Sequence, residues 1–140
     1  MKKLLSLLLV LAVGAWAQTL VEVTAVAALA SSLDPAVRLP QGTYKARSPE
    51  PILARFPGAK GYALETFAAK GLTSRLHAAL IHQVLTNLAA AGYFLESQEE
   101  KVVDGETRTK YLLKDGMGRT ALLLVVRKAD ELVYAFGKRK

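Results

Sequence analysis

The chain has 140 residues, 51% of them hydrophobic and 22% charged, with no cysteine and a formal net charge of +7. This length and composition predict one folded unit and exclude a disordered or fibrous chain. Without cysteine there can be no disulfide and no thiolate metal site, so stability must come from the hydrophobic core. Asn87 is the only asparagine and arginine is plentiful, which leans towards a thermophilic source, although a biased genome gives the same composition.

The first seventeen residues have the three-part layout of a secretory signal peptide. Met1-Lys2-Lys3 is positively charged, residues 4–13 are apolar apart from one serine, and Ala15-Trp16-Ala17 is a small-x-small cleavage site. A retained membrane anchor is the alternative, but the apolar run is shorter than the roughly 20 residues that span a bilayer. We therefore expect cleavage near Ala17-Gln18 and export to the periplasm or out of the cell, with no transmembrane segment in the mature chain.

Residues 18–60 are predicted to form a short N-terminal helix and a Pro/Gly-rich connector. Residues 25–33 are alanine-rich and helix-prone, although the β-branched residues of 19–24 favour a strand. All five prolines lie between Pro35 and Pro57, which is typical of irregular chain. Within this connector, Ser48-Pro49-Glu50 is suited to begin a single helical turn that runs to Arg55.

The main helix is predicted from Thr73 to Ala91. Thr73 or Ser74 can cap its start, and Gly92 stands where helices often end at positive φ. One apolar stripe recurs at the spacing of a helix with one buried face. Its members are Leu76, Leu80, Ile81, Val84, Leu85 and Leu88. Before this helix, residues 62–69 alternate enough to predict a strand.

After Gly92 the sequence predicts successive antiparallel hairpins. The expected strands are 93–103, 106–114, 119–128 and 131–136, separated by turns of which Asp104-Gly105 is the strongest signal. Residues 121–126 are apolar on both faces, which indicates a central strand covered on both sides. The predicted fold class is α+β, with one main helix packed on a small antiparallel meander. The expected organisation is a signal peptide over 1–17, the helix and connector over 18–60, and a compact domain over 61–140.

Several chemistries lack the residues that they need. His77 and His82 are five positions apart and point about 140° away from each other on a helix, so they cannot share a metal ion. We expect His77 to be a neutral, hydrogen-bonded histidine at the edge of the core and His82 to be a surface residue. No serine lies in a Gly-x-Ser-x-Gly elbow, and no glycine-rich phosphate loop is present. We therefore predict no catalytic residues, no metal and no cofactor.

A cluster of three glutamates follows the main helix. By the two-residue period of a strand, Glu96 and Glu100 share one face and Glu99 lies on the other. Glu96 and Glu100 could suggest paired carboxylates, but we interpret the cluster as solvated charge on an edge strand, because edge strands need charge to avoid pairing with other chains.

Basic residues are concentrated at the C-terminal end. Residues 18–100 carry seven Lys or Arg against seven Asp or Glu, whereas residues 101–140 carry ten against five. Three of these basic residues, at 108, 110 and 114, share one face of their predicted strand. The candidate anion-binding residues are Arg108, Lys110, Lys114, Arg127, Lys128, Lys138, Arg139 and Lys140. Such a surface would attract lipid head groups, cell-wall polymers or extracellular DNA, and a solvated sheet face with a basic tail is the alternative.

The sequence thus predicts a small exported domain of the bacterial envelope that is not an enzyme and works by binding. Its partner would be another envelope protein or an anionic polymer or membrane surface, contacted through the basic sheet face. Two alternatives stay open, which are a subunit of an envelope assembly and a component of a cell-wall hydrolase.

Overall fold

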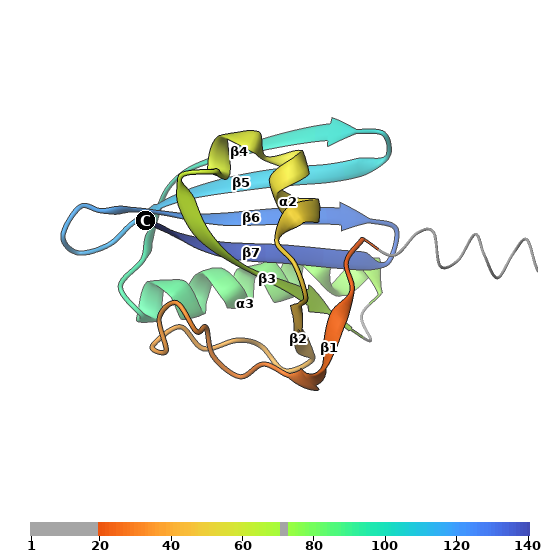
Figure 1. Cartoon of the computed structure of the whole chain (residues 1–140), viewed down its shortest axis with the longest axis horizontal. Coiled ribbons are helices and arrows are strands. Elements are labelled where there is room, and N and C mark those ends of the chain that lie inside the picture. The colour runs from red at the N-terminus through yellow and green to blue at the C-terminus, as the bar shows by residue number, and fades with distance from the viewer. Residues whose placement is uncertain (1–19, 71–72) are drawn as a thin grey trace, which may run out of the picture.

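A computed structural model describes residues 20–70 and 73–140 of the chain (Figure 1). The predicted signal peptide at 1–17 and its cleavage site lie outside the described residues. Among the residues that are described, no helix is long and apolar enough to cross a membrane.

The described residues form seven strands and two α-helices, together with two short 3-10 helices. In chain order they are β1 (Val23–Ala27), β2 (Thr43–Ala46), α2 (Glu50–Arg55), η1 (Pro57–Ala59), β3 (Tyr62–Ala69), η2 (Ser74–Leu76), α3 (His77–Ala90), β4 (Phe94–Val103), β5 (Glu106–Lys114), β6 (Thr120–Lys128) and β7 (Glu131–Arg139). The predicted α+β class is confirmed, and the helical turn at residues 50–55 is also confirmed.

All strands form one antiparallel sheet in the order β1-β2-β3-β7-β6-β5-β4. The last four strands are the predicted meander, in which each strand pairs with the next along the chain. Strand β3 extends this meander by pairing with β7 over its whole length, from Tyr62 opposite Arg139 to Ala69 opposite Leu132. The prediction of a small meander sheet is therefore incomplete, because β3, β2 and β1 continue the sheet beyond β7.

The alanine-rich segment near residue 25 is a strand, so the predicted N-terminal helix is wrong. Strand β1 pairs antiparallel with β2 at Val23 opposite Ala46 and at Ala27 opposite Tyr44. Pairing at the edge of an existing sheet outweighs the helix propensity of alanine here, because propensity is worth well under 1 kcal/mol per residue. The predicted segments 18–60 and 61–140 thus both contribute strands to one sheet.

Hairpin turns fix the register of the meander. Asp104 and Gly105 both have positive φ, at 52° and 77°, as a two-residue turn between β4 and β5 requires. Gly92 has a φ of 96° and ends α3, as predicted. The start of α3 differs from the prediction, because neither Thr73 nor Ser74 caps it with its side chain. Instead the Ser74 N–H donates to Asp130 Oδ1 at 3.0 Å.

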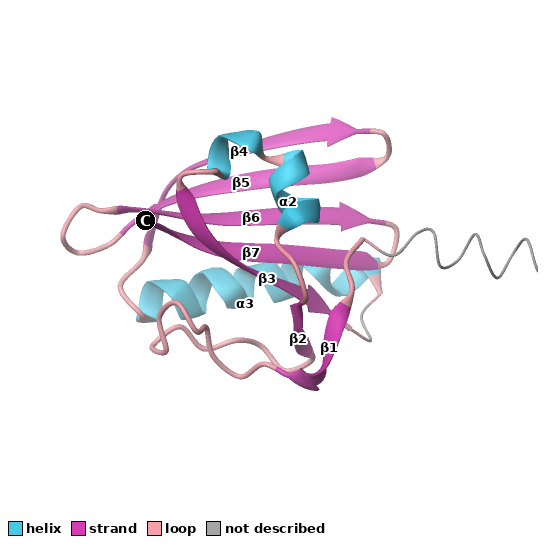
Figure 2. Cartoon of the chain, viewed as in Figure 1, coloured by secondary structure: helices cyan, strands magenta, loops and turns pink. Residues whose placement is uncertain are grey.

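Helix α3 covers one face of the sheet, as Figure 2 shows. Its buried side chains are His77, Leu80, Ile81, Val84 and Leu88. They pack against alternate residues of the central strands, including Leu123, Tyr134 and Phe136. Leu76 is 49% exposed and lies outside the stripe that was predicted to include it.

The opposite face of the sheet has its own core. Leu122, Leu124 and Val126 of β6 pack there against Ile52 of α2 and Val21. All six residues from 121 to 126 are buried, so β6 is covered on both faces as predicted. The sheet therefore lies between a layer formed by α3 and a layer formed by α2, η1 and the N-terminal segment (Figure 1).

Candidate basic groove

A groove of about 210 Å³ lies between the end of α2 and the β4–β5 hairpin. We call this feature the basic groove. It is lined by Arg55, Phe56, Glu99, Glu100, Lys101, Arg108 and Lys110. Four of these side chains are basic, and they come from three separate elements of the fold.

Buried Glu106 holds the two arginines of the basic groove in place. Arg55 donates from Nε to Glu106 Oε1 and from Nη2 to Oε2, both at 2.7 Å. Arg108 donates from Nε to the same Oε1 at 3.0 Å. Glu106 is only 4% exposed, whereas the side chains of both arginines are 22% exposed. One carboxylate thus fixes two guanidinium groups that still reach the surface.

The ionisation of Glu106 follows from these contacts. The hydrogen bonds from Arg55 lower its pKa to about 2, against the opposing effect of burial and with further help from Arg108. The same carboxylate raises the pKa of Arg55. Both charges are therefore permanent at neutral pH, and the arrangement is rigid because the bonds of Arg55 are bidentate.

We call Glu106, Arg55 and Arg108 the ion triad. Some of its N–H donors remain free on the side that faces the groove. Arg55 also donates from Nη1 to the carbonyl of Pro51 at 2.8 Å, so each of its three side-chain nitrogens already has a hydrogen-bond partner. The contacts of Arg108 within the described chain use only its Nε. Its terminal nitrogens are therefore available to an anion, together with the amines of Lys101 and Lys110, which lie beside it in the β4–β5 pairing.

The eight predicted anion-binding residues do not form one patch. Arg108 and Lys110 line the basic groove, whereas Arg127 lies on the α3 side of the sheet. Lys114 is away from the groove and its amine is 3.6 Å from a carboxylate oxygen of Glu96. Strand alternation places Arg127 on the opposite face, whereas Lys114 shares the face of Arg108 but lies at the far end of β5.

The C-terminal basic residues are also divided between the faces. The Lys138 amine lies 5.9 Å from the ring centre of Tyr93, which belongs to the core beneath α3. Arg139 lies over Tyr62, which packs on the other core. Lys128 is at the β6–β7 turn, and the backbone N–H of Lys140 donates to Gly61.

Sequence reasoning missed two of the four basic side chains of the basic groove. Arg55 lies more than fifty positions before Arg108, and only the packing of α2 on the sheet brings them together. Lys101 faces Arg108 directly across the β4–β5 pairing. That neighbour could have been found by counting outward from the Asp104-Gly105 turn.

The glutamate cluster is arranged differently from the prediction. The β4–β5 register shifts between Leu95 and Ser97, and this irregularity places Glu96 beside Lys114. Glu100 instead lies opposite Thr109 and accepts from its hydroxyl at 3.4 Å. An extra residue in one strand reverses the alternation beyond it, so Glu96 and Glu100 do not share a face.

A second buried carboxylate, Glu65, joins the N-terminal loop to β3. It accepts hydrogen bonds from the hydroxyls of Ser31 and Ser32, with Ser31 at 2.6 Å, and its Oε2 is 3.3 Å from the Lys45 amine. Burial opposes ionisation, but the hydrogen bonds from the serines prevail and lower its pKa. A carboxylate with a lowered pKa is a weak base, so it is poorly suited to activate either serine as a nucleophile.

The two histidines lie where the sequence placed them. His82 is exposed on α3, and His77 is 1% exposed beneath it. Within the described residues neither ring nitrogen of His77 has a hydrogen-bond partner, so the expected hydrogen bond is not seen. Burial is the largest effect on its pKa, which is lowered, with Arg127 acting in the same direction and Asp130 against it. The described chain holds no group of three or more potential metal ligands.

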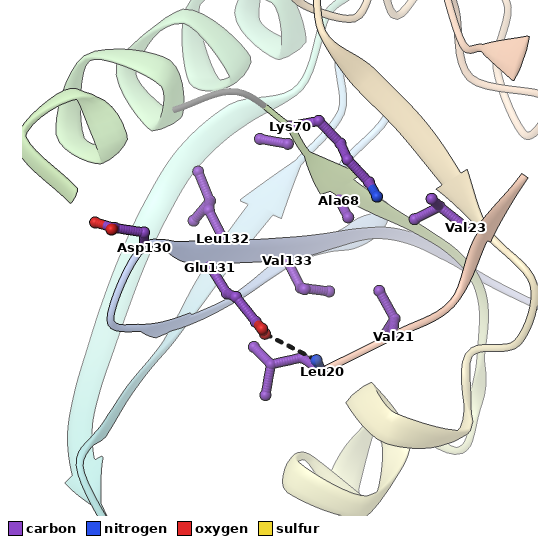
Figure 3. Close-up of a pocket in the computed structure, with 10 residues that line it drawn as sticks. Leu20, Val21, Val23, Ala68, Lys70, Asp130, Glu131, Leu132 and Val133 are labelled. Carbon is purple, nitrogen blue, oxygen red and sulfur yellow. Dashed lines mark hydrogen bonds between the residues drawn. The ribbon is translucent and has the colours of Figure 1, made fainter. Parts of the chain in front are cut away.

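Figure 3 shows another pocket, where the N-terminal segment meets the start of β7. The Leu20 N–H donates to Glu131 Oε2 at 2.8 Å, which fastens the segment to the sheet. Burial raises the pKa of Glu131 despite this hydrogen bond. The pocket has one lysine, Lys70, and mostly aliphatic walls, so it offers fewer fixed polar groups than the basic groove.

Comparisons with protein-family models, with curated proteins and with solved structures find no match to this chain, so none of them indicates an enzymatic activity.

Proposed function

We propose that this protein is an exported binding domain that attaches to anionic polymers of the bacterial envelope through the basic groove. The observation that carries the proposal is the ion triad, in which buried Glu106 fixes Arg55 and Arg108 at the surface. Fixed donors bind an anion with less loss of side-chain entropy than free ones. The proposal needs no catalytic group and no cofactor.

The balance of charge in the basic groove also supports this proposal. Its lining has four basic and two acidic side chains, and the two guanidinium groups share the single charge of Glu106 beneath them. Each lysine alone contributes little to the free energy of anion binding. A polymer that presents many anionic groups gains from repeated engagement, because each binding event raises the effective concentration of the next anion.

Export remains part of the proposal and rests on the leader sequence. The first described hydrogen bond that fastens the N-terminal segment involves Leu20, three positions after Ala17. Cleavage at the predicted site would therefore leave every described element intact. A prediction follows for secreted material, whose N-terminal residue should be Gln18 by mass spectrometry.

Retention on an immobilised polyanion tests the proposed function. The groove variant replaces Lys101 and Lys110 with glutamine, and the matched control replaces Lys128 and Lys140, which are outside the groove. Both variants lose two positive charges. We expect the groove variant to elute from a carboxylated polysaccharide matrix at clearly lower salt than the control. Equal shifts in the two variants would show that only net charge matters and would contradict a specific site.

One observation favours a second candidate function, which is a subunit of an envelope assembly. Strand β4 is an edge of the sheet, and Phe94, Leu95 and Val102 on it are 56%, 49% and 70% exposed. An exposed edge strand can pair with another chain, although the glutamates on β4 oppose this. Light scattering over a range of concentrations tests it, and a monomer at all concentrations would rule out self-assembly.

A further inference from the structure

We propose that the ligand of the basic groove is an acidic polysaccharide that carries carboxylates on its sugar rings. This inference rests on the proposed function and narrows it to one class of polyanion. It depends on the residues of the groove that are not basic, which are Phe56, Glu99 and Glu100.

Phe56 places an aromatic ring beside the basic side chains. It is partly buried against the core beneath α2, which fixes its position, and it also lines the groove next to Arg55. A sugar ring has an apolar face of C–H groups that packs on an aromatic ring, whereas a phosphate chain has no such face. The position of Phe56 therefore favours a saccharide over an inorganic polyanion.

Glu99 acts against ligands of high charge density. Glu99 lies directly opposite Lys110 in the β4–β5 pairing, so any anion at Lys110 is also close to this carboxylate. Polyphosphate has a charge on every phosphate with no sugar ring between successive charges, so more of its charges would lie near Glu99. A polysaccharide has hydroxyl groups between its carboxylates, and these can donate hydrogen bonds to Glu99.

The free end of Arg108 suits a carboxylate. Its Nε is bound to Glu106, which leaves its terminal nitrogens for a ligand. A guanidinium group binds a planar carboxylate with two parallel hydrogen bonds. The groove volume of about 210 Å³ is smaller than the roughly 300 to 1,000 Å³ of pockets for drug-sized ligands. We infer that it holds a single sugar unit of a chain that continues over the surface.

Calorimetric titration of the purified protein with three probes at one ionic strength tests this inference. The probes are a hexuronate oligosaccharide, the corresponding neutral oligosaccharide, and inorganic polyphosphate with the same number of charges as the hexuronate. We expect the hexuronate to bind at least tenfold more tightly than polyphosphate, and the neutral sugar not to bind measurably. This comparison uses the unaltered protein, so it does not depend on any variant that might fail to fold.

A pair of variants then tests the aromatic contact. Phe56→Leu keeps an apolar side chain against the core but removes the ring, and Phe94→Leu is a matched control on the exposed edge strand. We expect Phe56→Leu to weaken hexuronate binding by about three- to tenfold and to leave polyphosphate binding unchanged. Phe94→Leu should change neither. Thermal unfolding of each variant is measured alongside to confirm that it is folded.

The possible outcomes separate this inference from the proposed function. Equal binding of hexuronate and polyphosphate, or no effect of Phe56→Leu, would overturn the assignment to an acidic polysaccharide but leave anion binding in place. Stronger binding of polyphosphate would do the same and would favour a phosphate polymer. Absence of binding to both polyanions would overturn the proposed function as well.

Discussion

Replacement of Glu106 by glutamine should destabilise the protein by about 2 to 4 kcal/mol at pH 7. The change removes the one carboxylate that neutralises Arg55 and Arg108. It takes the charge from three hydrogen bonds of 2.7 to 3.0 Å and replaces one of the two acceptor oxygens with an amide nitrogen. Loss of one partner of a buried ion pair costs about 3 to 5 kcal/mol. The figure is smaller here because both arginine side chains are 22% exposed and water can reach them.

The pKa of Glu106 gives an independent value of similar size. The contacts lower it from 4.5 to about 2, and each unit corresponds to about 1.4 kcal/mol, so ionised Glu106 contributes about 3 kcal/mol. Because the folded-state pKa is the lower one, this contribution is fully present above about pH 4.5. It is lost as the pH falls from 4.5 towards 2. The E106Q variant should lack this part of the acid dependence.

Urea unfolding at several pH values measures both effects. Glu99→Gln is the control, because Glu99 is exposed on β4 and its loss should change stability by no more than about 0.5 kcal/mol. A stability of E106Q within about 0.5 kcal/mol of the wild type at pH 7 would refute the role that we assign to the ion triad.

Three further predictions concern the two cores. Leu124→Ala should lower the free energy of unfolding in urea by about 2 to 5 kcal/mol, because Leu124 is fully buried. Leu76→Ala at an exposed position should lower it much less. Equal losses would show that the core is misplaced. His77 has a lowered pKa, so wild-type stability should fall as the pH drops below about 6.5. A His77→Leu variant should show no such fall, and the same fall in the variant would assign it to another group. Tyr93→Phe removes a 2.5 Å hydrogen bond to Asp34 and should cost about 1 to 3 kcal/mol, while an unchanged unfolding midpoint would show that this hydrogen bond contributes nothing.

Local pattern was sufficient to predict the C-terminal half of the fold. The Asp104-Gly105 turn sets the register of β4 and β5, and the bounds predicted for the strand at 106–114 agree with the structure. Helix α3 was equally clear, because its buried stripe repeats over three turns. The turn residues and the apolar stripe each lie within a short stretch of sequence, so they can be recognised without knowing which distant residues they contact.

The N-terminal strands could not be predicted in the same way. Strand β1 has only five residues and depends on pairing with β2, which lies almost twenty residues later. Its alanines favour a helix when no partner is considered. The prediction failed because edge pairing is a tertiary effect that no local window of sequence contains.

The candidate site was predicted only in part, for a similar reason. Arg108 and Lys110 were found from strand periodicity, but periodicity does not reveal which strands lie beside each other or what covers them. Arg55 joins them through the packing of α2, and Glu106 acquires its role only once two arginines surround it. The basic groove is thus a product of the topology, whereas the basic composition was visible from the start.

Mapping of backbone amide shifts by nuclear magnetic resonance during titration with a hexuronate oligosaccharide tests the central claim most directly. We predict that the shifts gather on α2 and on the β4–β5 hairpin, around Phe56, Lys101 and Arg108. They should be absent from the exposed side of α3 around His82. Shifts spread over every basic region, or centred on Lys138 at the other face of the sheet, would contradict the basic groove as the binding site.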